Sequence, residues 1–296
     1  MDIGIFKFAP TVEGVIAEAK LANDQGFTSF WMPQIFGLDA LTAFAVTAKE
    51  VPNIQFGTGV VPTYRQHPMM MAQQALTVSQ VAEGRLTLGI GLSHQVVVES
   101  MWGYSYSKPL RHMREFLEAL VPLLNGEASG VSGEAITSHG GVEVEAPAPK
   151  LMIAALGPKM LELAGRVTDG TVTWMVGPNT LADHIVPIIN QAADAAGRPQ
   201  PGVAASIPVC VTNDVDDARA RAAKEYVIYG QLPSYRAMLD REGAAGPEDI
   251  AVIGSADEVS ERLAGVMAAG ATTLVANEFG TPDELAATRD ALQKLL

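Results

Sequence analysis

The chain holds one cysteine among its 296 residues, so no disulfide can form within it. It also lacks a long apolar run of the kind that spans a membrane, and aromatic residues make up only 6% of it. Basic residues are outnumbered, with 20 Lys and Arg against 33 Asp and Glu, giving a formal net charge of −13. A nucleic-acid partner needs a basic face, which this composition does not provide. The first residues, Met1–Lys7, lack the order of a signal peptide, so we expect a cytoplasmic protein that binds neither nucleic acid nor membrane.

Patterns for metal and hydrolytic chemistry are missing as well. The five histidines have no close partners, and neither a His-Glu-x-x-His nor a paired-cysteine pattern occurs, so we expect no metal site. No Gly-x-Ser-x-Gly elbow and no P-loop is found, which removes support for hydrolases and nucleotide kinases. Because the overall field is acidic, an anionic ligand would need a local site of backbone amides and a few placed cations.

Strand and helix patterns alternate along the whole chain, as in parallel α/β proteins. Eight strand-helix units predict a single (β/α)8 TIM barrel domain over residues 1–296, and an open doubly wound sheet is the alternative. The predicted strands cover residues 3–8, 28–32, 54–61, 86–92, 151–156, 171–176, 204–211 and 272–276. Insertions follow strands four and seven, at about 94–150 and 214–254, and the first is expected to contain a β-hairpin near 134–138 and 142–146. Chemistry in such a barrel lies at the carboxyl ends of the strands.

Two neighbouring strands have one face with almost no side chains. At strand period, bulky residues alternate with small ones in the fourth strand, and glycines interrupt the third. The glycines concerned are Gly57, Gly59, Gly89 and Gly91. Glycine inside a strand often marks the close approach of a ligand or of another backbone. The pattern therefore predicts room for a flat ring, while relief of crowding in the barrel interior stays open as the alternative.

Candidate polar groups follow the same strands. The turns Ala155–Lys159 and Val176–Asn179 each open a helix on proline, so free amides and the positive helix end favour a phosphate there. His94 lies just after the glycine-rich fourth strand, where it either donates a proton to a substrate above a bound ring or caps a loop. His67, before Pro68, is interpreted as structural or as binding a cofactor tail.

With these residues in view, the chain resembles the luciferase-like monooxygenase superfamily, and within it the oxidoreductases that use the deazaflavin coenzyme F420. The resemblance is carried by Gly57–Val60 with Arg65 and His67-Pro68, by Gly84–Gly91, and by Ala154–Pro158 with Asp169-Gly170. It implies a barrel with a flavin or deazaflavin ring at the carboxyl-end mouth, a small-molecule substrate, and a homodimer packed through helices near strands two and three. In the deazaflavin branch it also implies a non-proline cis peptide in strand three, which by position is Gly59-Val60.

The resemblance also implies which residues form the site. Gly59, Val60 and Val61 would back the ring, and Ser93 and His94 would lie beside its reactive edge. The turns at Leu156–Lys159 and Gly177-Pro178 would hold the phosphate and tail. The implied cofactor-binding residues are Gly59, Val60, Val61, Arg65, His67, Ser93, His94, Leu156, Gly157, Pro158, Lys159, Met175, Gly177 and Pro178.

One departure from the family bears on the chemistry. Many relatives end strand two with Pro-Asp-His, whereas this chain has Pro33-Gln-Ile35. Sugar-phosphate dehydrogenase chemistry that relies on that histidine is therefore not expected, and His94 becomes the predicted catalytic proton donor. We therefore expect an F420-dependent oxidoreductase that moves a hydride between the deazaflavin ring and a small organic substrate. An FMN-dependent monooxygenase and a non-catalytic cofactor- or ligand-binding barrel are the alternatives.

Overall fold

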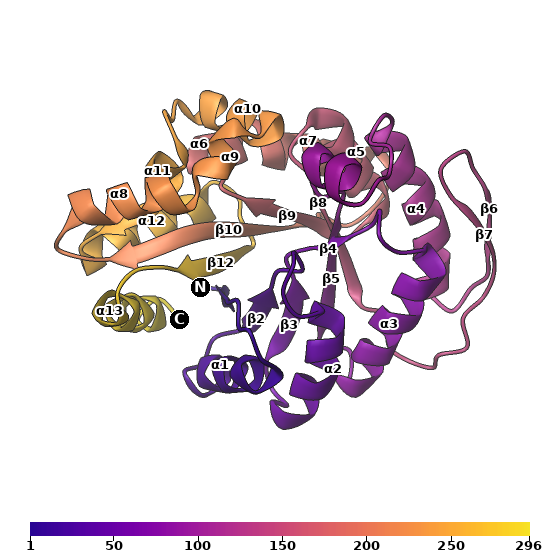
Figure 1. Ribbon diagram of the computed structural model, residues 1–296, viewed down its shortest axis with the longest axis horizontal. Helices are drawn as coiled ribbons and strands as arrows, with labels where there is room; N and C mark the ends of the chain where they lie inside the picture. The colour runs from indigo at the N-terminus through magenta and orange to yellow at the C-terminus, as the bar shows by residue number, and fades with distance from the viewer.

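The computed structural model, which describes residues 1–296, has eight parallel strands closed into a barrel (Figure 1). The strands are β1 (Ile3–Phe6), β2 (Ser29–Met32), β3 (Gln55–Thr58), β5 (Leu86–Gly91), β8 (Lys150–Ala154), β9 (Gly170–Trp174), β10 (Gly202–Val211) and β12 (Thr273–Glu278). β10 pairs with both β9 and β12, and β12 pairs with β1, so no edge is left in the ring. The predicted (β/α)8 barrel is confirmed, and the open sheet is excluded.

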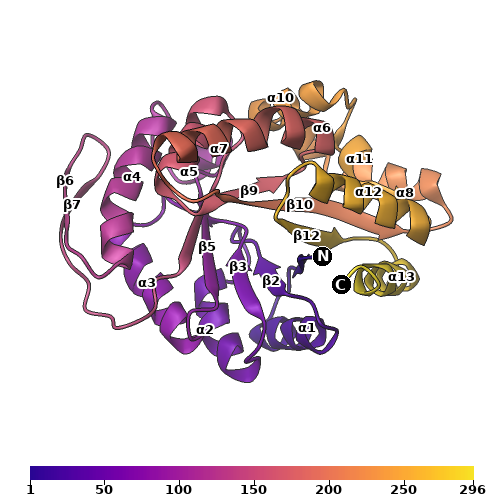
Figure 2. The same ribbon diagram turned by 180° about the vertical axis from the view of Figure 1, so that it is seen from behind.

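Helices lie around the outside of the barrel (Figures 1 and 2), and eight of them follow the eight barrel strands. They are α1 (Val12–Asp24), α2 (Ala40–Glu50), α3 (Pro68–Val81), α4 (Pro109–Leu124), α5 (Pro158–Val167), α7 (Val186–Ala195), α12 (Ala256–Ala268) and α13 (Pro282–Gln293). Side-chain caps mark three of the helix starts: Thr11 caps α1, while Ser255 and Thr281 form capping boxes on α12 and α13. The two chain ends lie together, and the Met1 amino group donates to the carbonyl of Leu295. None of the helices combines the length and the apolar character that a membrane-spanning helix needs.

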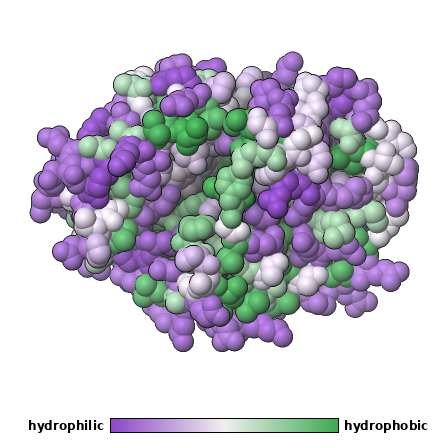
Figure 3. All heavy atoms as spheres, in the orientation of Figure 1, coloured by the Kyte–Doolittle hydropathy of each residue, from purple (hydrophilic) through white to green (hydrophobic).

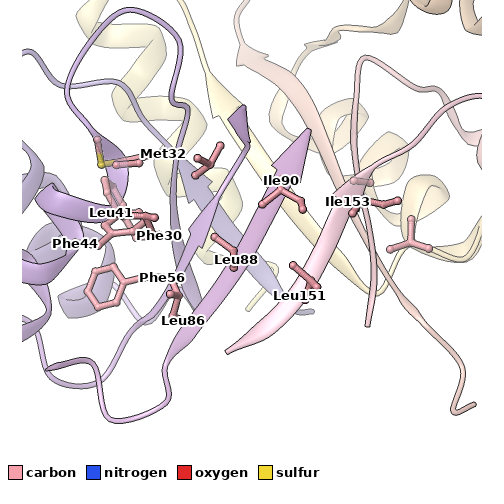
Figure 4. Close-up of a cluster of buried hydrophobic side chains, with 14 of the residues drawn as sticks. Phe30, Met32, Leu41, Phe44, Phe56, Leu86, Leu88, Ile90, Leu151 and Ile153 are labelled. Carbon is pink, nitrogen blue, oxygen red and sulfur yellow. The ribbon is translucent and has the colours of Figure 1, made fainter. Parts of the chain in front are cut away.

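Alternation along each strand divides the apolar residues between two cores. The outward side chains of β5 and β8 pack against the helices, and Figure 4 shows Leu88, Ile90 and Ile153 in one such row. The inward side chains come from several strands and fill the barrel interior: Trp31, Met152, Val172, Ala204 and Val275, with Phe6 and Val60 packed on them. The interior is therefore closed by side chains below the mouth, as in other barrels of this architecture.

The excursion after β5 differs from its prediction. It contains the short π-helix η1 (Val97–Met101) and an antiparallel hairpin of β6 (Ser129–Ser132) and β7 (Thr137–Gly140), which stands beside α3 and α4 (Figure 1). The predicted hairpin at 134–138 and 142–146 was therefore wrong in position. The turn falls at residues 133–136, where the buried Glu115 carboxylate accepts the amides of Ala135 and Ile136. The segment at 142–146, in which Val and Glu alternate, forms no strand. Side chains of α3 instead donate hydrogen bonds to the carbonyls of Glu145 and Pro147.

The excursion after β10 is mostly helical. It comprises α8 (Val215–Glu225), α9 (Val227–Gln231), α10 (Pro233–Glu242) and α11 (Pro247–Ile250), followed by the short strand β11 (Val252–Gly254). The sequence did not predict β11, which pairs with β10 at residues 209–211, beyond the register that β10 shares with β9. In both ribbon views α9 and α10 lie near α6 (Pro178–Thr180), which follows β9 and continues through η2 (Leu181–Ile185) into α7. These helices therefore stand at the carboxyl-end mouth of the barrel.

Candidate active site

The third strand is broken at the mouth. β3 ends at Thr58, the Gly59-Val60 peptide bond is cis as the resemblance implied, and the strand resumes as β4 (Val61–Pro62), which pairs with the end of β5. The Thr58 hydroxyl takes over the interrupted ladder. It accepts from the amide of Gly89 and donates to the carbonyl of Gly89, both at 2.8 Å. The amide and the carbonyl of Gly89 are both hydrogen-bonded in this way, although β3 is interrupted beside them.

The strand glycines make room for the protein's own atoms, which corrects the prediction that they clear space for a ring. A Cβ on Gly57 would overlap the Trp31 ring, and one on Gly59 would lie 2.8 Å from Phe6. At Gly91 a Cβ would come within 2.6 Å of Val60 Cγ2. The alternative reading, relief of crowding inside the barrel, therefore explains these positions. A ring bound at the mouth would rest on the Val60 bulge rather than in a hollow of the strands.

Aromatic side chains form the floor of the mouth next to this bulge. The Phe6 and Trp174 rings lie nearly parallel, with centroids 6.1 Å apart. Ser206, the neighbour of Trp174 in the sheet register, is buried with no hydrogen-bond partner for its hydroxyl. A buried hydroxyl without a partner is uncommon in proteins, and a polar group of a ligand is one kind of partner that would satisfy it. In the space-filling view this face is hollowed near its centre, with apolar residues along the rim (Figure 3).

His94 is the histidine whose ring is free to act. It follows Ser93, which adopts a left-handed backbone conformation with φ 63° at the end of β5. His67, His112, His139 and His184 each have a ring nitrogen in a hydrogen bond within the chain, whereas neither nitrogen of His94 has one. Burial lowers the pKa of His94 below its usual 6.5, so the imidazole is neutral near pH 7. A neutral imidazole offers one donor and one acceptor to a bound molecule.

Helices α9 and α10 place a roof over this histidine. The Tyr235 ring meets the His94 ring edge-on, with centroids 5.9 Å apart, and lies 5.0 Å from the ring of Tyr229. Tyr229 in turn meets Trp174 edge-on at 5.7 Å. A continuous series of aromatic contacts therefore connects the floor to His94.

The two predicted anion turns differ. Gly157 begins α5 without a side-chain cap, and the neighbouring Lys159 is exposed and forms no ion pair, so this turn can receive an anion. The turn of Gly177 and Pro178 is already filled by a carboxylate of the chain. Glu242 Oε1 accepts from the Asn179 amide at 3.1 Å and Oε2 from the Thr180 amide at 2.7 Å. In this structure Gly177 and Pro178 therefore do not offer their turn to a phosphate.

Five other predicted residues also have definite positions. The Val61 side chain is buried in the outer core, and the Met175 side chain is buried in a cluster that includes residues of α8. His67 is structural: Nδ1 accepts the Met69 amide at the start of α3, and Nε2 lies 2.8 Å from the carbonyl of Thr137. Arg65 is exposed over the Trp102 ring and has no carboxylate partner. Leu156 is half-buried below α5, and its carbonyl accepts from His184 Nε2 at 2.8 Å.

Sequence reasoning missed the roof and a second buried histidine. Tyr229, Tyr235 and Glu242 lie in an insertion without a recognisable motif. Only their contacts with β9, His94 and α6, respectively, show where they belong. His112 lies on α4 beside Arg111, in a stretch whose basic residues suggest a solvated helix face. It is 8% exposed, lies parallel to the Tyr64 ring at 3.9 Å and contacts Thr63 Oγ1 at 3.0 Å, and burial lowers its pKa to about 4.

A closed parallel barrel with its polar groups at the carboxyl-end mouth defines an enzyme-type (β/α)8 site. Comparison with known proteins then identifies the family. Residues 7–295 match the luciferase-like monooxygenase family, and the chain belongs to it. The 5,10-methylenetetrahydromethanopterin reductase of Methanolobus tindarius is 32% identical over 233 residues, which cover 77% of this chain and 70% of that one.

Solved structures agree on the fold. The coenzyme F420-dependent tetrahydromethanopterin reductase of Methanopyrus kandleri superposes with a TM-score of 0.82 at 20% identity, covering 99% of this chain and 97% of that one. The oxygenating constituent of 3,6-diketocamphane monooxygenase of Pseudomonas putida, in complex with FMN, superposes with a TM-score of 0.78 at 20% identity over 99% of this chain and 96% of that one. The family match and the reductase relative identify the chain as an oxidoreductase. Its structural neighbours include one protein described as F420-dependent and one described as a complex with FMN.

The residues at this mouth fit a cofactor with a flat body and an anionic tail. The apolar bulge at Val60 and the unpartnered hydroxyl of Ser206 suit a planar ring that carries polar edge groups. The open turn at Gly157 and the unpaired cations Lys159 and Arg65 suit phosphate or carboxylate groups.

Proposed function

We propose that the protein is an F420-dependent oxidoreductase that moves a hydride between the deazaflavin ring and a small organic substrate, with His94 exchanging the proton. The observation that supports this proposal most directly concerns His94. Its imidazole is neutral near pH 7, lies at the end of β5 and has no hydrogen-bond partner in the chain. The relatives support the cofactor choice, since the reductase of Methanopyrus kandleri is described as F420-dependent. Bound F420 would supply the hydride chemistry, because it has carbon where flavin has its central nitrogen.

The chain's own residues would orient the reactants and manage the proton. Val60 would support the ring, and Ser206 and the open turn at Gly157 would offer polar groups to the cofactor. His94 accepts a proton from a substrate hydroxyl directly, because its ring is neutral; in the reducing direction it first takes a proton from solvent and then passes it on. Tyr235 covers this histidine and limits the access of water.

Binding of F420 and of FMN to the purified protein, measured in parallel by fluorescence titration, tests the cofactor. We expect F420 to bind and FMN to bind at least tenfold more weakly. Tight FMN binding without F420 affinity would establish the flavin monooxygenase instead. If F420 binds but no electron acceptor or donor is turned over, the protein is a carrier.

Replacing His94 with Asn tests the proton-transfer role separately. We expect F420 binding to change less than threefold and turnover to fall by 10²-fold or more, the usual contribution of general acid-base catalysis. His139→Gln is the matched control, because His139 is an exposed histidine of the β7 strand and should leave turnover unchanged. Equal turnover of the His94 variant and the control would remove His94 from the mechanism.

A further inference from the structure

One helix of the second insertion touches both the catalytic histidine and a turn at the end of β9. Tyr235, in the first turn of α10, contacts the His94 ring, and Glu242, its last residue, binds the amides of Asn179 and Thr180. The Thr180 hydroxyl also donates to the carbonyl of Met238 in the same helix, at 3.3 Å. α10 is therefore fastened at one end and covers the mouth with the other.

The fastening is specific to a carboxylate at this position. Each oxygen of Glu242 takes one amide, and such charge-assisted bonds are about twice as strong as neutral ones. Gly177 leaves the space for this carboxylate, since a Cβ there would overlap it. α10 has few other anchors, because only Met238 and Leu239 among its residues are buried.

We propose that Glu242 is a positioning residue of the active site: its carboxylate clamps α10 to the first turn of α6, and this clamp holds Tyr235 over His94. The inference deepens the proposed function and rests on the role assigned there to His94. Glu242 touches no reacting group. It acts through Tyr235, whose ring keeps water away from the imidazole.

The groups around His94 allow its pKa to report on the hydration of its imidazole ring. Tyr235 faces it from α10, and Tyr106 donates to the carbonyl of the adjacent Ser93. Both tyrosines are neutral at pH 7, since burial raises the pKa of each. The carboxylate of the nearby segment, Glu99, accepts from the Tyr106 amide. Burial alone accounts for the low pKa of His94, so loss of the cover raises that pKa.

The sign of the change separates the clamp from simple electrostatics. Removing the negative charge of Glu242 can only lower the pKa of a histidine through Coulomb's law, whereas opening the roof hydrates the imidazole and raises it. An upward shift in Glu242→Ala therefore reports movement of α10. Asp240→Asn is the matched control: it removes the same charge from the same helix, and its carboxylate pairs with Arg236 rather than with the α6 turn.

The experiment is an NMR titration of the protein labelled with ¹³C at histidine Cε1, without cofactor, with the His94 signal assigned from His94→Asn. We expect the His94 pKa to rise toward 6.5 in Glu242→Ala and in Tyr235→Ala, and to rise less in Glu242→Gln, which keeps one acceptor oxygen. Tyr235→Phe, which retains the ring, and Asp240→Asn should leave it unchanged or slightly lower. Hydrogen exchange should also show loss of protection at Asn179 and Thr180 in Glu242→Ala.

The clamp is refuted if Tyr235→Ala raises the His94 pKa while Glu242→Ala and Glu242→Gln do not. It is equally refuted if Tyr235→Ala has no effect, because the ring then does not shield the histidine. These titrations need neither F420 nor turnover, so they decide the clamp even where the proposed activity fails. Where the activity holds, the pH profile of kcat/KM should move with the titrated pKa in Glu242→Ala, and stay in place in Asp240→Asn.

Discussion

Replacing Gly91 with alanine distinguishes the two interpretations of the glycine-rich strands. If the space before Gly91 were open for a ligand ring, the new methyl group would leave stability intact and harm only cofactor binding. In the structure this methyl would lie 2.6 Å from Val60 Cγ2 and 3.4 Å from the Cβ of Ala154. Overpacking of this kind destabilises a protein by about 1–3 kcal/mol. We therefore expect Gly91→Ala to lower the free energy of unfolding by about 2 kcal/mol.

The same contact predicts a rescue. Val60→Ala removes both γ-methyl groups and should by itself cost about 1 kcal/mol, because this valine is only half-buried. In the double variant the alanine at 91 occupies the vacated space. The two effects should then fall short of their sum by about 1–2 kcal/mol, the coupling seen for residues in direct contact.

Gly89→Ala is the contrasting case, because its obstacle is backbone. A Cβ there would overlap the carbonyl oxygen of Thr58, and the two hydrogen bonds between Thr58 and Gly89 would be disturbed. We expect a loss of about 3–5 kcal/mol, from overpacking and two buried hydrogen bonds together, and no rescue by Val60→Ala.

Urea unfolding followed by circular dichroism gives the free energies, with equal m-values required across the set. Gly130→Ala is the control, since no atom lies within 4 Å of a Cβ at this β6 position and alanine should be neutral or slightly stabilising. Strict additivity of Gly91→Ala and Val60→Ala, to within about 0.5 kcal/mol, would refute the packing argument.

Three further changes have expected outcomes. The pKa of His112 is about 4 in the folded state and 6.5 in the unfolded state. Its contribution to the free energy of unfolding is therefore fully present above pH 6.5 and falls by up to about 3 kcal/mol toward pH 4. Urea unfolding of His112→Phe at several pH values should lack this part of the loss. Arg289→Met leaves the buried Glu278 carboxylate with Lys7 as its remaining cation, at 3.1 Å, and should cost about 3 kcal/mol by the same unfolding assay at pH 7. Lys159→Gln should weaken F420 binding about fivefold to tenfold at low salt and less at high salt by fluorescence titration, whereas Lys150→Gln, at the opposite end of the barrel, should not.

Local sequence patterns predicted the fold well, because a parallel barrel repeats the same strand-helix unit along the chain. Strand and helix periods alternate, and capping sequences such as Ser255–Glu258 mark helix starts without reference to the rest of the chain. The hairpin at 129–140 was misplaced because its register depends on Glu115, a residue of the preceding helix that accepts the turn amides. β11 was missed because three residues give no periodicity, and β10 alone supplies its partner.

The site was predicted less completely, for a related reason. His94 and the Gly157 turn follow directly from strand ends, and the structure places both at the mouth. The role of Gly57 could not be read from its own strand, since the Trp31 ring that fills its space comes from β2. Glu242 lies 65 residues beyond Gly177 in the sequence, so no local pattern indicates that its carboxylate occupies that turn. Contacts between distant segments decide both positions.

The unequal construction of floor and roof leads to a last prediction. The floor belongs to close-packed strands, whereas α9 has no buried residue and α10 rests on two buried residues, Met238 and Leu239, together with the Glu242 clamp. Segments with few buried contacts open at low free energy, so amides of α9 and α10 should exchange with deuterium at least tenfold faster than those of β5. A ligand that binds between the barrel strands and the helices α9 and α10 must displace these helices, because the close-packed strands cannot move apart. Saturating F420 should therefore change exchange at α9 and α10 and leave β5 unaffected; a change confined to β5 would place the guest inside the barrel and contradict this division.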